Sequence, residues 1–227
     1  MKRPPQKHIG FFDVLEAFQQ AKGCALCELE ARDIRRYLEN LLYENVNDVG
    51  VRADLAKSRG YCRLHAHMLL EFQDGLGTAI LYQDQVTMFL DFLKSLHGLP
   101  AKLFRGRVPE AWGDVALCPA CKIASWSRQD HLTTLVEWLG DPEIRKAVEA
   151  SPGLCVPHLL PALRQAQDAS ARDYLATVHV GKFKGLADDL AEFIRKHDYR
   201  FNRELWGKER NSWIRAINMM TGLKNVF

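Results

Sequence analysis

The sequence predicts an all-α protein of two tandem homologous helical modules, each held by a Cys3His metal site, followed by a C-terminal capping helix. Three observations lead to this prediction. Apolar residues recur at helical spacing, a segment of the chain is repeated, and all six cysteines fall into paired motifs. The composition, 47% hydrophobic and 26% charged, is ordinary for a globular protein.

Helical periodicity follows both cysteine pairs. Ile34, Leu38 and Leu41 lie on one face of a helix that begins near Cys24, and a similar pattern follows Cys118. Further helices are expected after each Cys-x-x-His pair, and longer ones at about residues 78–96 and 170–197. Little of the sequence is typical of strands, so we expect helices joined by short turns.

The internal repeat defines the expected domains. Residues 48–62 align without a gap to residues 141–155, and the two segments share Asp, Arg, Ser, Gly and Cys at matching positions. Gly60 and Gly153 stand where a helix ends in the left-handed conformation. We expect a first module at 1–98 (repeat core 24–98), a linker at 99–117, a second module at 118–198 and a basic amphipathic segment at 199–227.

The cysteines and two histidines form ligand pairs at spacings suited to one metal ion. Cys-x-x-Cys at the start of a helix brings two sulfurs to a single ion, and Cys-x-x-His supplies a third sulfur and an imidazole. We expect each module to fold back as a hairpin that joins its own two pairs. The predicted sites are Cys24, Cys27, Cys62 and His65 in the first module, and Cys118, Cys121, Cys155 and His158 in the second.

The ligand chemistry favours two Zn²⁺ ions with a structural role. Four protein ligands leave no open position for a substrate or an activated water, and no catalytic residue is predicted. Glu28 and Glu30 follow the first pair, where acidic residues complement the helix dipole. Two [4Fe-4S] clusters with Cys3His ligation are the alternative, and would indicate electron transfer or redox sensing. A redox-active dithiol is a third interpretation.

The C-terminal segment carries an excess of positive charge. From Arg195 onward there are eight Lys or Arg residues against three acids. An apolar stripe of Leu205, Trp213, Ile214, Ile217 and Met220 predicts a helix that caps both modules. The competing interpretation is a docking helix for a protein partner or for nucleic acid. The candidate partner-binding residues are Arg203, Trp206, Lys208, Arg210, Trp213 and Arg215.

The sequence predicts neither a membrane segment nor a secretion signal. No window approaches the length of apolar residues that a transmembrane helix needs, and a polar stretch follows the basic N-terminus. A cytoplasmic protein is therefore expected, and in that compartment six cysteines favour metal binding over disulfides. The sequence does not predict an oligomeric state.

The motifs also carry a resemblance. Gly23-Cys-x-x-Cys27 with Gly60-Tyr-Cys-x-x-His65, its second copy Leu117-Cys-Pro-Ala-Cys121 with Gly153-Leu-Cys-Val-Pro-His158, and the ending Ser212–Gly222 resemble an uncharacterised prokaryotic family of duplicated helical proteins. The resemblance covers nearly the whole chain and implies a fold but no activity. We therefore expect a non-enzymatic, metal-stabilised scaffold that mediates a macromolecular interaction.

Overall fold

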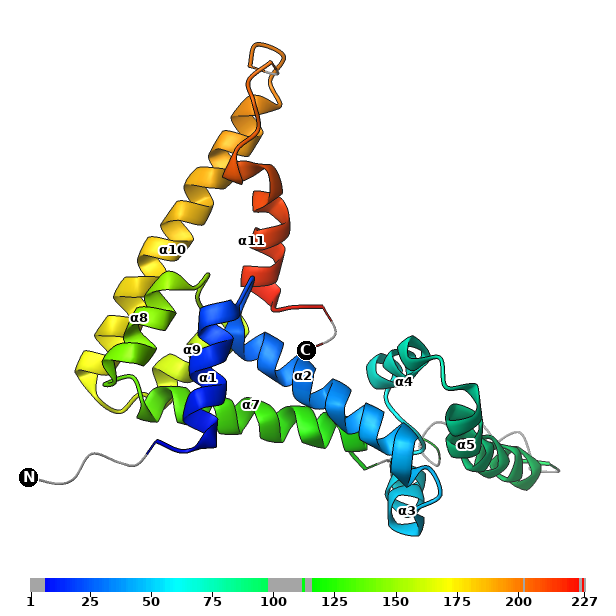
Figure 1. Cartoon of the computed structure of the whole chain (residues 1–227). Coiled ribbons are helices and arrows are strands. Elements are labelled where there is room, and N and C mark those ends of the chain that lie inside the picture. Colours follow the sequence, from blue (N-terminus) through cyan, green and yellow to red (C-terminus); the bar gives the residue numbers. More distant parts are fainter. Residues whose placement is uncertain (1–6, 98–111, 113–115, 202, 225, 227) are drawn as a thin grey trace, which may run out of the picture. The chain divides into compact units, whose positions relative to one another are not determined.

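The computed structural model describes residues 7–97, 112, 116–201, 203–224 and 226, and this part of the chain is all-α, with no strand (Figure 1). None of its helices is long and apolar enough to cross a membrane. The predicted linker at 99–117 lies mostly outside the described residues. The helices are α1 (Ile9–Gln20), α2 (Ala25–Asn40), η1 (Leu41–Asn45), α3 (Val49–Lys57), α4 (Arg63–Leu69), η2 (Leu70–Phe72), α5 (Gly75–Ser95), α7 (Pro119–Glu137), α8 (Pro142–Ala150), α9 (Val156–Gln165), α10 (Ala169–Lys196), η3 (Lys208–Asn211) and α11 (Ser212–Thr221).

Matching residues begin and end the corresponding helices of the two predicted copies. Asp48 caps α3 by accepting a hydrogen bond from the Val51 N–H at 2.8 Å, and Asp141 caps α8 in the same way through Glu143. After each of these helices the chain turns at a glycine with positive φ, 93° at Gly60 and 95° at Gly153. Such values favour glycine because it has no Cβ. The predicted turns are therefore confirmed.

The compact units of the fold differ from the predicted tandem modules. One unit combines the two ends of the chain, Met1–Arg32 and Trp126–Phe227, and we call it the terminal unit. The other, Asp33–Ser125, is the central unit. The boundaries fall inside α2 and α7, so the division at residues 98 and 118 is corrected. The reason lies in helix length, because α2 has 16 residues and extends about 24 Å, which carries the chain away from its own cysteine pair.

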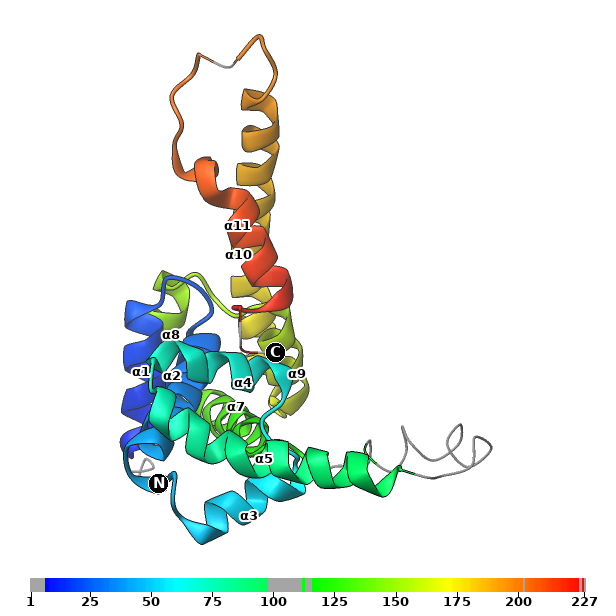
Figure 2. The ribbon, with the colours of Figure 1, turned by 90° about the vertical axis from the view of Figure 1, so that its right-hand side faces the viewer.

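The core of the terminal unit includes a helix that the sequence prediction missed. Phe11, Val14 and Phe18 of α1 are buried and belong to the same apolar cluster as Leu135 of α7 and Ile144 of α8. Their spacing of three and four residues is the signal that could have identified α1. In both views α11 lies beside α10, and the two helices are in contact (Figures 1 and 2).

The central unit has its own core. Ile34 and Leu38 from the second half of α2 pack with Leu55 of α3, Leu69 of α4 and Leu81 of α5, all of them nearly fully buried. Ala120 and Ala124, at the start of α7, complete this cluster. Each unit therefore contains an apolar core and one cysteine-rich group.

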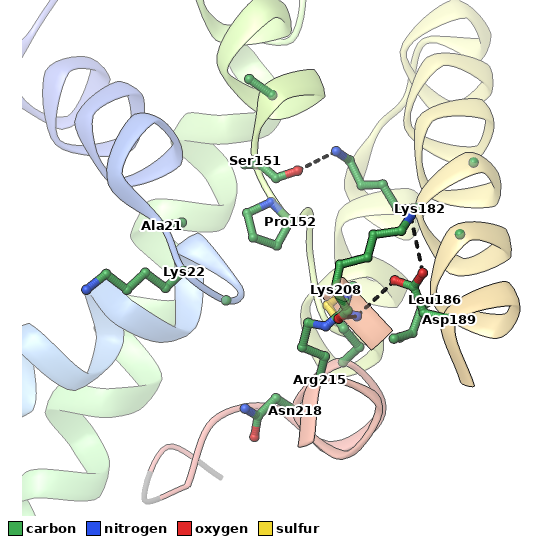
Figure 3. Close-up of a pocket in the computed structure, with 15 residues that line it drawn as sticks. Ala21, Lys22, Ser151, Pro152, Lys182, Leu186, Asp189, Lys208, Arg215 and Asn218 are labelled. Carbon is green, nitrogen blue, oxygen red and sulfur yellow. Dashed lines mark hydrogen bonds and ion pairs between the residues drawn. The ribbon is translucent and has the colours of Figure 1, made fainter. Parts of the chain in front are cut away.

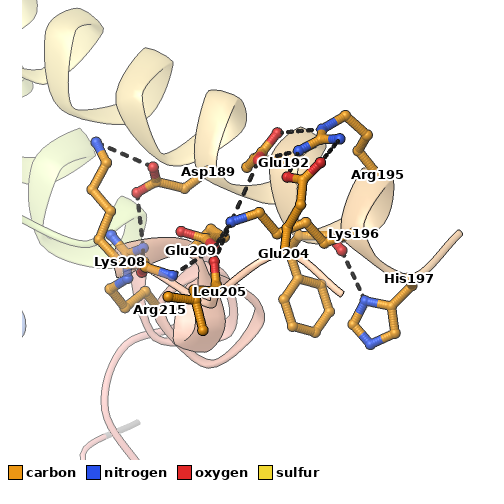
Figure 4. A network of polar contacts seen from close by, with 12 residues as sticks. Asp189, Glu192, Arg195, Lys196, His197, Glu204, Leu205, Lys208, Glu209 and Arg215 are labelled. Atoms are coloured by element: carbon orange, nitrogen blue, oxygen red, sulfur yellow. Dashed lines mark hydrogen bonds and ion pairs between the residues drawn. The ribbon is translucent and has the colours of Figure 1, made fainter. Parts of the chain in front are cut away.

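Polar contacts hold the C-terminal segment against α10 (Figure 4). Lys196 donates to Glu209 at 2.6 Å and to the Leu205 carbonyl at 2.7 Å, and both ionic side chains are largely buried. Asp189 pairs with Lys208 and Arg215. Hydrogen bonding to the Gly207 N–H and to Lys196 lowers the pKa of Glu209 to about 2. Ion pairs thus hold the C-terminal segment against the last turns of α10.

The expected apolar stripe does not make this contact. Trp213, Ile217 and Met220 are at least half exposed, and Leu205 is 91% exposed. The buried side of α11 consists instead of Ser212 and Met219. A C-terminal helix is present as predicted, but α11 contacts α9, α10 and η3 within the terminal unit, and the apolar face that we expected to be buried is exposed to solvent.

We expect Lys196→Met to loosen the C-terminal segment, because it leaves the Glu209 carboxylate buried without its cation. Amide hydrogen exchange in η3 and α11 should accelerate by about tenfold or more, while exchange in α8 stays unchanged. Lys184→Met, on an exposed position of the same helix, is the matched control. Equal exchange rates in the two variants would contradict the role assigned to the Lys196–Glu209 pair.

Candidate metal centres

The terminal unit contains a buried group of three cysteines and one histidine. Cys24 and Cys27 stand at the start of α2, and Cys155 and His158 at the start of α9. The His158 Nδ1 atom lies 3.5, 3.4 and 3.4 Å from the sulfurs of Cys24, Cys27 and Cys155. The Cys27 and Cys155 sulfurs are 3.6 Å apart. All four residues are buried, and we call them the terminal cluster.

The central unit contains a second group of the same composition, formed by Cys62, His65, Cys118 and Cys121. The His65 Nδ1 atom lies 3.2, 3.7 and 3.4 Å from the sulfurs of Cys62, Cys118 and Cys121. His65 and Cys118 are buried, whereas Cys62 and Cys121 are partly exposed. We call this group the central cluster.

The structure therefore corrects the predicted pairing of the ligands. The sequence spacing predicts that Cys24 and Cys27 join Cys62 and His65, but each Cys-x-x-Cys pair instead meets the Cys-x-x-His pair of the other predicted copy. The cause is the same helix length that moved the unit boundaries. Because α2 and α7 both cross from one unit to the other, the pair at the start of each helix is separated from the pair that follows it in sequence.

The geometry of both clusters fits one tetrahedral ion. With Zn–S near 2.3 Å and Zn–N near 2.0–2.1 Å, the edges of a zinc tetrahedron are about 3.5 Å between sulfur and nitrogen and about 3.8 Å between sulfurs. The distances of 3.2–3.7 Å within the clusters are close to these edges. Both clusters could therefore hold a metal ion.

Burial and hydrogen bonds within each cluster shift the pKa values of its thiols and imidazole. Burial opposes charge on both Cys24 and His158, but their hydrogen bonds to each other and to Cys155 lower the pKa of Cys24 and raise the pKa of His158 to about 11. In the central cluster, burial and the neighbouring Cys118 and Cys62 raise the pKa of Cys121 to about 12. Crowded thiols need a positive partner before more than one of them can ionise.

A buried carboxylate orients the histidine of the terminal cluster. The Glu30 Oε2 atom lies 3.4 Å from His158 Nε2, on the side of the ring away from the sulfurs. Arg128 binds Glu30 through Nε at 3.1 Å and Nη2 at 2.5 Å, and it also donates to the Val226 carbonyl. A carboxylate in this position fixes the tautomer of a metal-binding histidine.

This contact corrects the earlier interpretation of Glu30 as a residue that only complements the helix dipole. Glu28 differs, because its carboxylate accepts from the N–H groups of Lys22 and Gly23 at the start of the helix. The repeat offered no signal for Glu30, because the equivalent residue of the second copy is Ala124. The two clusters thus share their ligands but differ in what surrounds the histidine.

A second buried histidine holds the chain that leads to Cys155. His179 of α10 accepts from the Leu154 N–H at 2.8 Å through Nε2 and contacts the Leu175 carbonyl at 2.7 Å through Nδ1. Burial lowers the pKa of His179. The neutral ring can donate from one nitrogen and accept at the other, as this position requires. No motif or residue spacing in the sequence identifies His179.

The six candidate partner-binding residues have different surroundings. Lys208 and Arg215 pair with Asp189, and Trp206 packs against Phe193 and His197 with ring centroids 5.4 and 5.2 Å away. Arg203, Arg210 and Trp213 are exposed. The structure therefore brings three of the six into contacts within the terminal unit.

The fold and the two clusters define an all-helical protein with paired Cys3His groups. The chain belongs to a family of unknown function (DUF6062), whose model matches residues 6–226. It is similar to an uncharacterized 23.9 kDa protein in the xynA 3′ region of Caldicellulosiruptor sp. (strain Rt8B.4). The two chains are 26% identical over 212 residues, which cover 92% of this chain and 99% of the relative. No solved structure matches the chain. The expected membership of an uncharacterised family is confirmed.

The crossed pairing predicts which cysteine substitutions act on the same metal ion. Cys24→Ser with Cys155→Ser alters one cluster, so the double variant should lose one metal equivalent and keep the other. Cys24→Ser with Cys62→Ser alters both clusters and should lose two. Native mass spectrometry of the intact chain measures the stoichiometry. The opposite result, two equivalents lost in the first variant and one in the second, would restore the pairing within each repeat.

We expect Glu30→Gln to weaken metal binding in the terminal cluster by about 10–100-fold, because the substitution removes the charge that orients His158. Competition with a chromogenic chelator, resolved into two binding steps, measures the effect. The central cluster should keep its affinity, and Glu143→Gln, at an exposed pair with Lys7, is the control. A loss of affinity equal in both clusters would show general unfolding and refute the positioning role.

Proposed function

We propose that this protein is a helical scaffold stabilised by two structural zinc ions, and that it binds a macromolecular partner. The observation that carries the metal assignment is the spacing of the four ligand atoms. In both clusters the distances between these atoms are close to the edge lengths of a single coordination tetrahedron. Thiolate and imidazole ligands in this ratio suit zinc. A structural role follows from the ligand number, since four protein ligands complete the shell.

The distances also favour single ions over the iron–sulfur alternative. In a [4Fe-4S] cluster each protein ligand binds a different iron, so the ligand atoms stand farther apart than the edges of one metal's shell. In the terminal and central clusters every ligand atom lies within 4.8 Å of the others. A mononuclear site fits this spacing better than a four-iron cluster.

We further interpret the chain as a duplicated unit whose halves have exchanged ligands. Cys62 and Cys155 both precede a helix with extended backbone, at φ −60° and ψ 163° and at φ −68° and ψ 161°. The corresponding helices α3 and α8 have nine residues each. These matches, and the order of the helices around them, support a repeat of one structural element.

The partner surface that we propose lies on α11. Trp213, Ile217 and Met220 stand four and three residues apart, which places them on one face of the helix, and they are 50%, 57% and 57% exposed. Arg210 is exposed just before this helix. An apolar face near positive charge suits an acidic protein surface with an apolar centre.

Metal analysis tests the zinc assignment. We expect two zinc per chain, a colourless solution and a melting temperature that falls by ten degrees or more when a strong chelator removes the metal, because metal binding is coupled to folding. Cys155→Ser should lose one zinc and lower the melting temperature of the terminal unit, whereas Ser170→Ala, on the first turn of α10, should change neither. Brown protein purified without oxygen, containing iron and inorganic sulfide, would replace the zinc proposal with the cluster alternative.

Site-specific photo-crosslinking in cells tests the partner surface. A photoreactive amino acid at position 217 should give a discrete adduct with a protein, and the same group at Val180, 68% exposed on α10, should not. An adduct lost on nuclease treatment would identify nucleic acid in place of the protein. Identical adducts at both positions would refute a dedicated surface on α11.

A further inference from the structure

The terminal unit contains a cavity that the metal clusters do not use. It has a volume of about 530 Å³ and lies between the end of α8, the middle of α10, α11 and the loop before α2 (Figure 3). Small-molecule sites in proteins typically occupy about 300–1,000 Å³. The cavity is therefore large enough for a compact organic ligand.

Positive charge dominates the polar lining of this cavity. Lys182, Lys208 and Arg215 line it together with Asp189, the single acid among the described lining residues. Lys22 also belongs to the lining, but its amine points away from the other cations in Figure 3. The lining thus has more positive than negative charge.

The contacts of these cations leave that excess in place. Lys208 and Arg215 share one carboxylate, with distances of 3.2 and 2.8 Å to the two oxygens of Asp189. Lys182 donates to the carbonyls of Glu149 and Ser151, which are uncharged. Lys208 and Arg215 therefore share one carboxylate, while Lys182 is held by two carbonyls and has the Glu149 carboxylate as its nearest negative charge. Low-dielectric walls strengthen the attraction of such a site for an anion.

The remaining walls are apolar and kept open by glycine. Pro152, Leu186 and Met219 contribute carbon surface. Gly181 and Gly185 stand one turn apart on α10, and a Cβ added to either would meet no atom within 4 Å outside its own helix. Glycine inside a helix is unfavourable relative to alanine, and here it leaves the space beside the helix empty.

We propose that this cavity binds a small organic anion, a carboxylate or phosphate on an apolar or aromatic body. The acidic group lies at Lys208 and Arg215, where it competes with Asp189 for their hydrogen bonds. The body lies along Gly181 and Gly185 and against Pro152 and Met219. A neutral molecule would leave the cations of the lining without an anion, and a bare inorganic anion would leave its apolar surface without a contact.

The test uses the metal-loaded full chain and 1-anilinonaphthalene-8-sulfonate, an aromatic anion whose fluorescence rises in apolar surroundings. We expect saturable binding of one dye per chain, displaced by phenyl phosphate but not by benzyl alcohol at the same concentration. Inorganic phosphate should displace the dye at least tenfold less effectively than phenyl phosphate. Equal displacement by benzyl alcohol or by inorganic phosphate would overturn the proposed ligand class.

Two variants locate the binding. Gly185→Leu fills the cavity from α10 and should weaken dye binding at least tenfold, whereas Gly140→Leu, also in open space but outside the cavity, should not. Lys208→Gln should weaken displacement of the dye by phenyl phosphate about threefold or more. The Lys208 side chain is 81% exposed, so we expect this variant to fold. It therefore tests the site even if Gly185→Leu does not fold. Unchanged binding in Lys208→Gln, or in a Gly185→Leu chain with wild-type circular dichroism, would overturn the proposal.

Discussion

The fold depends on the meeting of two ligand pairs that lie far apart in sequence. In the terminal cluster the sulfurs of Cys27 and Cys155 approach to 3.6 Å across 128 positions of the chain. Bringing such distant segments together costs conformational entropy, which grows slowly with the length of the loop. Burial of the surrounding core offsets this cost, and a metal ion held by the cluster would offset it further. Both helices that start at a Cys-x-x-Cys pair, α2 and α7, then continue into the other unit, so the position of each cluster also fixes where these helices begin.

The crossed pairing nests one unit inside the other along the chain. Every residue of the central unit, Asp33–Ser125, lies between the two ligand pairs of the terminal cluster. The central unit is continuous in sequence and can close its cluster over a shorter loop. The terminal unit needs segments from both ends of the chain, including α1, whose Phe11 and Phe18 enter its core. The two clusters also differ in burial. All four ligands of the terminal cluster are buried, whereas two ligands of the central cluster are partly exposed.

The terminal cluster, the cavity and the C-terminal segment share the same short loops. Gly23, which lines the cavity, directly precedes Cys24, and Pro152 lies three residues before Cys155. Lys182 and His179 of α10 hold the chain between Ser151 and Leu154, and Arg128 links Glu30 to the Val226 carbonyl. Each of these positions is therefore linked, in sequence or through a hydrogen bond, to a segment that carries ligands of the terminal cluster. Lys208 and Arg215 pair with Asp189 of α10, so these basic C-terminal residues also hold the C-terminal segment in place.

The sequence by itself determined the helical class, the cap residues Asp48 and Asp141, the glycine turns and the eight residues that form the two clusters, because each of these depends on local spacing and backbone preference. Only the tertiary structure decided which pairs meet, since the same local motifs are compatible with ligands from one copy or from both. The length and direction of α2 and α7 determine which of these two pairings forms. The tertiary structure also revealed which core α1 packs into and which residue Glu30 contacts, because local spacing can identify a helix but not its partners. The exposed stripe of α11 has a similar cause. Helical spacing places Trp213, Ile217 and Met220 on one face, but the ion pairs of Lys196 and Asp189 determine which face turns toward the protein.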